Sequence, residues 1–190
     1  MTLSNDEAVE RVHAALERRE LATSELTARR LGELLGQTTA VIYHRWGSLE
    51  GFLYAVAVVG FGRVGDRLEA MDSERASLED VAEYLVCFAV DHPELYELMQ
   101  ERRWDWAALR KGGHLRPAET MRAAAALQAI FTREGLSRPM ERVRLFAAGM
   151  HGIAAMAITG RLNAGENQTP DRVVAIRTAR HLARLIVAGE

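Results

Sequence analysis

The segment 26–53, LTARRLGELLGQTTAVIYHRWGSLEGFL, constrains the fold most, because it predicts two short helices joined at Gly36. Thr27 is expected to cap the first helix, since its hydroxyl can accept a hydrogen bond from a free backbone N–H. Glycine at position 36 can adopt the left-handed conformation that ends a helix and turns the chain. Gly32 carries no side chain, so the second helix, over about 38–45, can cross close to the first. These features predict a helix-turn-helix, although a helical corner that binds nothing would share the same geometry.

The second of these helices has one buried position and an open surface. Ile42 is expected to face the core, which leaves Thr39, Ala40, Tyr43 and His44 on the remaining surface. Small and hydroxylated residues at the start of a helix suit entry into a DNA major groove, which is about 12 Å wide.

A family resemblance follows from these residues and their neighbours. The pattern L-T-x-R-x-L-G-x-L-L-G, followed by I-Y-x-R-W-x-S-x-E-x-F-L, resembles the DNA-binding domain of the TetR family of bacterial regulators. In that family one helix packs behind the motif, and a fourth helix connects it to a larger helical domain. Ser4 and Glu7 form a capping-box pattern that predicts the first of these helices, and the fourth would begin after Ser48.

The resemblance implies roles for individual residues in DNA binding. Arg29 matches a position that reaches a base edge or a phosphate, and Tyr43 matches a phosphate contact. The other expected contacts are Thr39 and Ala40 at the bases, and Thr38, His44 and Arg45 at the DNA backbone.

Two positions depart from the family pattern. Leu49 stands where the family usually has a lysine that contacts a phosphate, and Gln37 stands where it prefers an apolar residue. The missing lysine predicts a salt dependence of DNA binding that is shallower by about one charge. We expect the Gln37 side chain to reach solvent or DNA.

The net charge gives no general attraction to DNA, because 24 lysines and arginines face 26 aspartates and glutamates. The distribution of the charges matters more. Arg29, Arg30, His44 and Arg45 all fall inside the motif. All basic residues except Lys111 are arginines, which can bind phosphate or guanine through two hydrogen bonds. For most of the 23 arginines, a biased base composition of the genome is the better explanation.

Length and composition predict two domains. A chain of 190 residues that is 48% hydrophobic can bury a second helical core beside the motif. We expect a DNA-binding domain over 1–47 and a ligand-binding and dimerisation domain over 48–190, linked by a helix over about 48–70. Cys87 is the only cysteine, which excludes an intrachain disulfide. The absence of an apolar leader and of a long apolar run predicts a cytoplasmic protein with no membrane partner.

The fold class expected is all-α: an N-terminal three-helix helix-turn-helix domain plus a larger antiparallel helical bundle, about nine helices in total. Ser77 and Pro93 mark helix starts, Gly112 and Gly113 a break, and Gly135 a helix end. A helix is expected over about 115–133. No alternating pattern predicts a strand.

The last two long helices are expected to form a dimer interface. Between 145 and 158 the only polar side chain is His151, which predicts a helix buried on every side. The final helix, opened by 169–171, carries a second apolar stripe. The resemblance implies that these two helices pair with those of a second subunit, and a two-fold dimer predicts a palindromic DNA site. A central helix of a monomer is the alternative.

Aromatic and methionine side chains between the motif and these helices suit a small apolar ligand. The same residue types are also common in an ordinary core. The candidates for ligand binding are Tyr84, Phe88, Tyr96, Met99, Trp104, Trp106, His114 and, on the apolar helix, His151.

The function that these observations favour is a homodimeric transcriptional repressor that binds double-stranded DNA and is released by a small apolar ligand. The alternative is a helical ligand-sequestering or protein-interaction module with a non-functional helix-turn-helix. We expect no enzyme activity, cofactor or metal, because no histidine pair, phosphate-binding glycine loop or Gly-x-Ser-x-Gly motif nominates a site.

Overall fold

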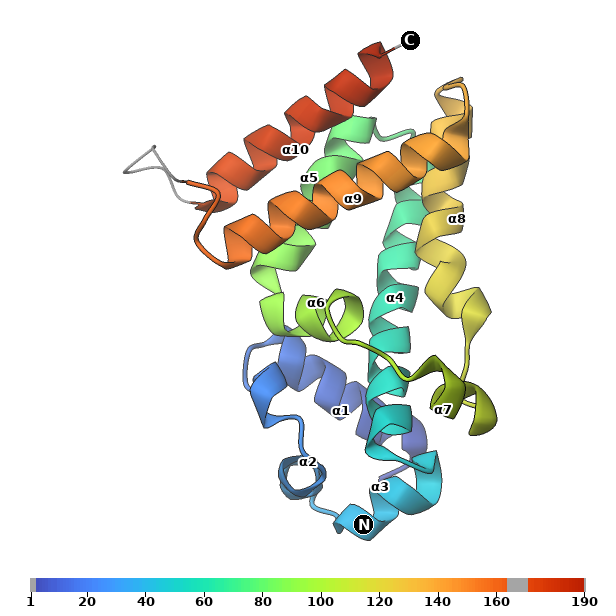
Figure 1. Ribbon diagram of the computed structural model, residues 1–190, viewed down its shortest axis with the longest axis vertical. Helices are drawn as coiled ribbons and strands as arrows, with labels where there is room; N and C mark the ends of the chain where they lie inside the picture. Colours follow the sequence, from blue (N-terminus) through green and yellow to red (C-terminus); the bar gives the residue numbers. More distant parts are fainter. Residues whose placement is uncertain (1–2, 164–170, 190) are drawn as a thin grey trace. The chain divides into compact units, whose positions relative to one another are not determined.

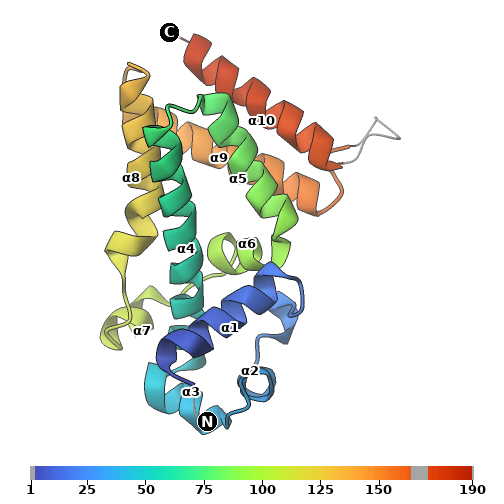
Figure 2. The same ribbon diagram turned by 180° about the vertical axis from the view of Figure 1, so that it is seen from behind.

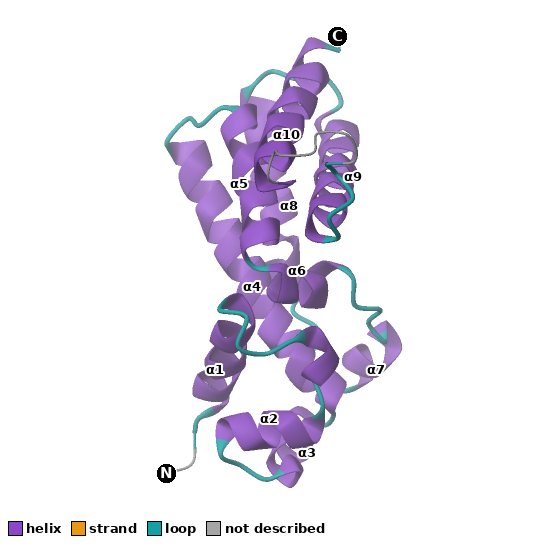
Figure 3. Ribbon diagram, turned by 90° about the vertical axis from the view of Figure 1, so that its left-hand side faces the viewer, coloured by secondary structure: helices purple, strands orange, loops and turns teal. Residues whose placement is uncertain are grey.

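A computed structural model describes residues 3–163 and 171–189, and within these ranges it contains helices and loops but no strand (Figure 3). The all-α prediction is confirmed. The described residues form ten α-helices and one 3₁₀ turn, where the sequence predicted about nine helices. The additional helix is α7 (Trp106–Lys111), which the sequence analysis did not anticipate. Asp105 precedes it and accepts a hydrogen bond from the Ala108 backbone N–H at 2.9 Å, which caps so short a helix.

Packing divides the chain into two compact units. Unit 1 comprises residues 1–63 and 92–121, and unit 2 comprises residues 64–91 and 122–190. Helices α4 (Leu49–Ser73) and α8 (Pro117–Arg133) contribute to both units. The packing units do not test the predicted division of function, with DNA binding in 1–47 and ligand binding and dimerisation in 48–190. That division stays a prediction.

Unit 1 contains the helices of the predicted motif (Figures 1 and 2). The capping box that predicts its first helix is present, because the Ser4 hydroxyl accepts from the Glu7 N–H and the Glu7 carboxylate accepts from the Ser4 N–H. Val12 and Leu16 on that helix are fully buried, as their spacing indicates. The elements are α1 (Asn5–Glu17), the 3₁₀ turn (Thr23–Glu25), α2 (Ala28–Leu35), α3 (Thr39–Trp46), the first part of α4, α6 (Pro93–Gln100) and α7.

No single helix in the described ranges is long and apolar enough to span a membrane. By length and composition alone, α3 and α4 pass that test only as a pair, and the pair is bent by 74°.

Unit 2 is built around α5 (Leu78–Asp91), α9 (Pro139–Ile158) and α10 (Asp171–Ala188). Helix α10 packs along both α5 and α9 (Figures 1 and 2). Ser77 caps α5, since its hydroxyl accepts from the Asp80 N–H at 3.2 Å. The predicted opening of the last helix at Thr169 and Pro170 lies outside the described residues.

Helix α9 is buried on one face only within the chain. Phe146 and Ile153 lie in the core, whereas Leu145 is 61% exposed and Met156 is also exposed. The prediction of burial on every side is therefore wrong for the single chain. The physical reason is that α5 and α10 cover one side of α9 and leave an apolar outer face uncovered.

Candidate DNA-binding surface

The turn between α2 and α3 has the geometry that its residues predict. The Thr27 hydroxyl accepts from the Arg30 N–H at 3.2 Å, and Gly36 ends α2 with a left-handed φ of 64°. A Cβ placed on Gly32 would lie 2.7 Å from the carbonyl oxygen of Gln37. Glycine at 32 is therefore required for the close approach of the turn to α2.

The inner face of α3 is anchored in the core of unit 1. Ile42 is fully buried, and the Trp46 ring packs against Phe52 with 4.5 Å between ring centroids. Thr38 precedes the helix in an extended conformation, and its hydroxyl makes no capping hydrogen bond. These contacts fix which face of α3 points away from the core.

The opposite face of α3 is exposed and carries four residues predicted to contact DNA. Positions 39, 40, 43 and 44 share one side of a helix because of the 3.6-residue repeat. Thr39, Ala40 and His44 are exposed, and Tyr43 is 50% exposed despite its large apolar ring. The chain thus leaves a mixed hydroxyl, methyl and aromatic surface uncovered on the second helix of the motif.

Two arginines flank this surface on α2, and both lie near acidic partners. The Arg29 side chain is 88% exposed and its Nε lies 3.9 Å from a Glu33 carboxylate oxygen. Arg30 lies 3.3 Å from Glu25 and 3.9 Å from Glu33. Exposed ion pairs of this kind contribute little to stability, so a phosphate could replace the carboxylates at small cost.

Arg45 differs from the other residues predicted to contact the DNA backbone, because its side chain is already bound within the protein. Its Nη1 donates to the Leu3 carbonyl oxygen at 2.7 Å, and its guanidinium lies 6.0 Å from the centre of the Trp46 ring. A neutral carbonyl leaves the positive charge uncompensated. The contact ties the end of α3 to the segment before α1 and leaves Arg45 half-buried.

Gln37 contradicts the expectation that its side chain reaches solvent or DNA. Both amide atoms, Nε2 and Oε1, are buried and have no hydrogen-bond partner among the described residues. The residue after the turn glycine faces inward, which accounts for the family preference for an apolar side chain there. Because the side chain at this position points inward, the Gln37 amide is buried without a hydrogen bond.

The residues predicted to bind an apolar ligand fall into both packing units. On α5 in unit 2, the Tyr84 and Phe88 rings lie side by side with 6.4 Å between their centroids. His151 is half-buried on α9. Burial raises the pKa of the Tyr84 hydroxyl. Unit 1 contains the other five: Tyr96, Met99, Trp104, Trp106 and His114.

The aromatic residues of unit 1 gather around Tyr54 on α4, a residue that the sequence analysis missed. Trp104 and Trp106 pack edge-on against the Tyr54 ring, with 5.4 and 6.1 Å between ring centroids. Met99 is buried on α6, and its sulfur would lie 2.5 Å from a Cβ placed on Gly60. No local pattern pairs position 54 with 104, because the contact joins segments far apart in the chain.

His114 lies at the junction of α3 and α4. A Cβ placed on Gly51 would lie 3.0 Å from its Cδ2 atom, and one on Gly47 would lie 3.4 Å from its Nε2. The imidazole therefore packs against two glycines beside the end of the second motif helix. Tyr84, Phe88 and His151 belong to the other unit.

Comparison with known families gives one match. A family model described as "Tetracyclin repressor-like, C-terminal domain" matches residues 78–181, which is more than half of the 190 residues. No curated protein and no solved structure matches the chain. The matched segment runs from the start of α5 into α10 and lies outside the helix-turn-helix.

Proposed function

The chain belongs to the family of tetracycline repressor-like (TetR) regulators, and we propose that it is a DNA-binding transcriptional repressor released by a small apolar ligand. The observation that carries the proposal is the exposed face of α3, where Thr39, Tyr43 and His44 remain uncovered while Ile42 anchors the helix. The hydroxyl of Tyr43 and the side chains of Thr39 and His44 are therefore accessible to DNA.

In the proposed complex α3 enters the major groove. Thr39 and Ala40 face the bases, and Tyr43 donates its hydroxyl to a phosphate. Arg29 reaches a base edge or a phosphate beside α3, while Thr38, His44 and Arg45 contact the DNA backbone. Backbone contacts fix the register of the protein, and base contacts supply the specificity.

The proposed repressor is a homodimer that forms through the outer faces of α9 and α10. Leu145 on α9 and Leu185 on α10 are both exposed in the single chain and line one hollow together with Leu182. A two-fold axis would place two copies of α3 about one helical turn of DNA apart, roughly 34 Å, on a palindromic site.

The proposed ligand acts by shifting a population of conformations. A ligand that binds more tightly to the form of the dimer unable to match the operator lowers the occupancy of DNA. In unit 2 the proposed contacts for an apolar molecule are Tyr84, Phe88 and His151. In unit 1 a separate proposed set of contacts consists of Tyr96, Met99, Trp104, Trp106 and His114.

A mobility-shift titration tests the DNA-binding proposal, with DNA from the region upstream of the gene and a random duplex for comparison. Arg29→Ala is expected to weaken specific binding by about 1–3 kcal/mol, the range for a bidentate base contact. Arg45→Ala should instead weaken binding to both duplexes about equally. Arg103→Ala changes an exposed arginine outside the motif and serves as the matched control.

The alternative function, a helical sequestering or interaction module, predicts a different result. A folded, dimeric protein that binds no duplex specifically at low salt would exclude the repressor. An unchanged operator affinity of Arg29→Ala would refute only the role of that residue.

A further inference from the structure

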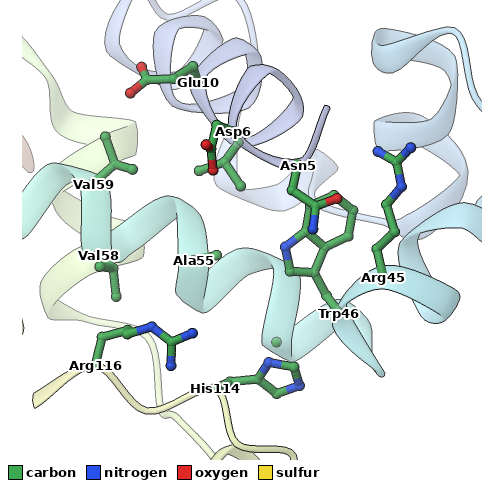
Figure 4. Close-up of a pocket in the computed structure, with 12 residues that line it drawn as sticks. Asn5, Asp6, Glu10, Arg45, Trp46, Ala55, Val58, Val59, His114 and Arg116 are labelled. Carbon is green, nitrogen blue, oxygen red and sulfur yellow. The ribbon is translucent and has the colours of Figure 1, made fainter. Parts of the chain in front are cut away.

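Unit 1 contains a cavity that shares only Arg45 and His114 with the contacts proposed above for DNA and for the apolar ligand. Its volume is about 620 Å³, within the range of small-molecule sites, roughly 300–1,000 Å³. The cavity is lined by the start of α1, the end of α3, the first part of α4 and the segment 114–116 (Figure 4). All of these segments belong to the same packing unit.

The middle of the cavity is apolar. Ala55, Val58 and Val59 on α4 form one wall (Figure 4). Val9 of α1 also lines the cavity. The Trp46 ring lies at one end of this wall. A ligand therefore needs an apolar or aromatic body to fill the central part without desolvating polar groups.

The edge formed by α1 is acidic. Asp6 and Glu10 both line the cavity on this side (Figure 4). Glu10 is already paired, since its carboxylate lies 2.6 Å from the Arg63 guanidinium. Asp6 has no ion pair within the described part of the chain. The carboxylate of Asp6 is thus available to a cationic group.

The opposite edge, formed by the segment 114–116, is basic. Arg116 lies across the α4 wall from Asp6, with His114 beside it (Figure 4). The Arg116 Nη1 donates to the Gly113 and Leu115 carbonyl oxygens at 3.1 and 3.0 Å. These acceptors are neutral, and no described carboxylate compensates the guanidinium charge.

We propose that this cavity binds a small amphoteric molecule with an ammonium group at one end, a carboxylate at the other and an apolar body between them. The ammonium group lies at Asp6, the carboxylate at Arg116, and the body against Val58 and Trp46. Charge-assisted hydrogen bonds form at both ends, and the apolar wall reduces their screening by water. A molecule with a single charge would leave one edge of the cavity unpaired.

The site shares only His114 with the residues proposed to contact the apolar ligand, and its occupant would contact α3 directly. Arg45 and Trp46, the last two residues of α3, both line the cavity. A bound molecule would therefore contact the end of the recognition helix without covering Thr39, Ala40 or Tyr43.

Binding is tested on the full chain with three probes of matched size: para-(aminomethyl)benzoate, para-methylbenzoate and para-methylbenzylamine. The first carries both charges, and each of the others lacks one. Proton–nitrogen NMR spectra report on the Trp46 indole N–H during each titration. We expect saturable binding of the first probe, with each singly charged probe binding at least about tenfold more weakly, the scale of one charge-assisted hydrogen bond.

Substitutions at each edge identify the groups responsible. Asp6→Asn and Arg116→Gln should each weaken the first probe by about tenfold, the same scale. Glu119→Gln and Arg103→Gln change exposed residues that do not line the cavity and should leave the affinity unchanged. Asp6 lies in the first turn of α1, where a carboxylate also stabilises the helix. Thermal unfolding of each variant therefore distinguishes a loss of binding from a loss of helix stability.

Three results would overturn the proposal: no shift at Trp46, equal binding of a singly charged probe, or an equal loss with the control variants. The titrations contain no DNA, so failure here leaves the repressor proposal standing, and failure of DNA binding leaves this site standing.

Discussion

At the scale of single residues, three side chains of unit 1, those of His13, Gln37 and Arg102, carry buried polar atoms without a hydrogen-bond partner among the described residues, and the first two yield predictions. Gln37 leaves both amide atoms without partners, and His13 leaves Nε2 without one. A buried polar group that lacks its hydrogen bond costs about 1–3 kcal/mol. Both residues therefore lower the stability of the unit that presents α3, and each yields a prediction.

Replacing Gln37 with methionine, which has a similar length and no hydrogen-bonding requirement, is expected to stabilise the protein. The free energy of unfolding in urea should rise by about 1–3 kcal/mol, because the unsatisfied amide is removed. Gln128→Met makes the same chemical change at an exposed position of α8. It should alter the free energy of unfolding by less than about 0.5 kcal/mol. Destabilisation by Gln37→Met would show that the amide has a partner in solution.

His13 predicts a stability that depends on pH. Burial lowers the pKa of its imidazole, and the nearby Arg63 charge lowers it further, against smaller opposite effects of Glu17 and Glu10. His92 also lowers it. The Arg63 Nη1 lies 3.1 Å from Nδ1, and because guanidinium can only donate, the neutral ring carries its proton on Nε2.

Because the folded-state pKa is depressed, the unfolded chain binds the proton first as the pH falls. Above the unfolded pKa of about 6.5 the residue has no effect on the pH dependence of stability. Below it, stability should fall by up to about 1.4 kcal/mol per pH unit until the folded form also protonates. Urea unfolding between about pH 7 and pH 5 measures the free energy of unfolding of the wild type and of His13→Gln. The wild type should lose more stability than the variant as the pH falls. Parallel curves for the two proteins would contradict it.

At the scale of elements, α2 and α4 show where a glycine is required and where it is only tolerated. Gly32 faces the Gln37 carbonyl so closely that a Cβ would lie 2.7 Å from the oxygen. Gly62, inside α4, has nothing within 4 Å of a Cβ. The two positions differ only in what lies opposite them, because both are helical.

Gly32→Ala is therefore expected to destabilise the protein by about 1–3 kcal/mol through overpacking against backbone. Gly62→Ala should stabilise it by about 0.5–1 kcal/mol, because alanine loses less conformational entropy in a helix. Circular dichroism during thermal unfolding measures both. Equal effects of the two substitutions would mean that the turn can move away from α2.

At the scale of the whole molecule, the uncovered apolar face of unit 2 supports the proposed assembly. Leu145 and Leu185 are 61% and 55% exposed in the single chain. Solvent exposure of several large apolar side chains on two adjacent helices is typical of an interface between subunits.

Leu185→Glu is expected to raise the dimer dissociation constant by at least about thirtyfold, the scale of a central interface residue. Sedimentation velocity measures the dissociation constant, and circular dichroism checks that the helices remain. Met121→Glu, at a side chain 58% exposed on α8, is the matched control and should leave the dimer intact. A wild-type protein that is monomeric at all concentrations would remove this interface from the proposal.

The parts of the motif that depend on neighbouring residues follow from the sequence. Ser4 and Thr27 cap their helices, Gly36 takes its left-handed φ, and Ile42 is buried, all as predicted. Each of these outcomes depends on residues within one or two helical turns. The sequence alone therefore determines the helix boundaries, the turn and the inner face of α3.

Only the tertiary structure decides what distant segments do to one another. It turns the Gln37 amide inward, places Arg45 on the Leu3 carbonyl, and divides the aromatic residues predicted as one ligand site between two units. It also places Asp6 and Arg116 on opposite edges of one cavity, although they lie 110 positions apart in the sequence. Local patterns encode hydrogen bonds and helix faces, whereas these contacts arise from the packing of helices against each other, to which no local pattern refers.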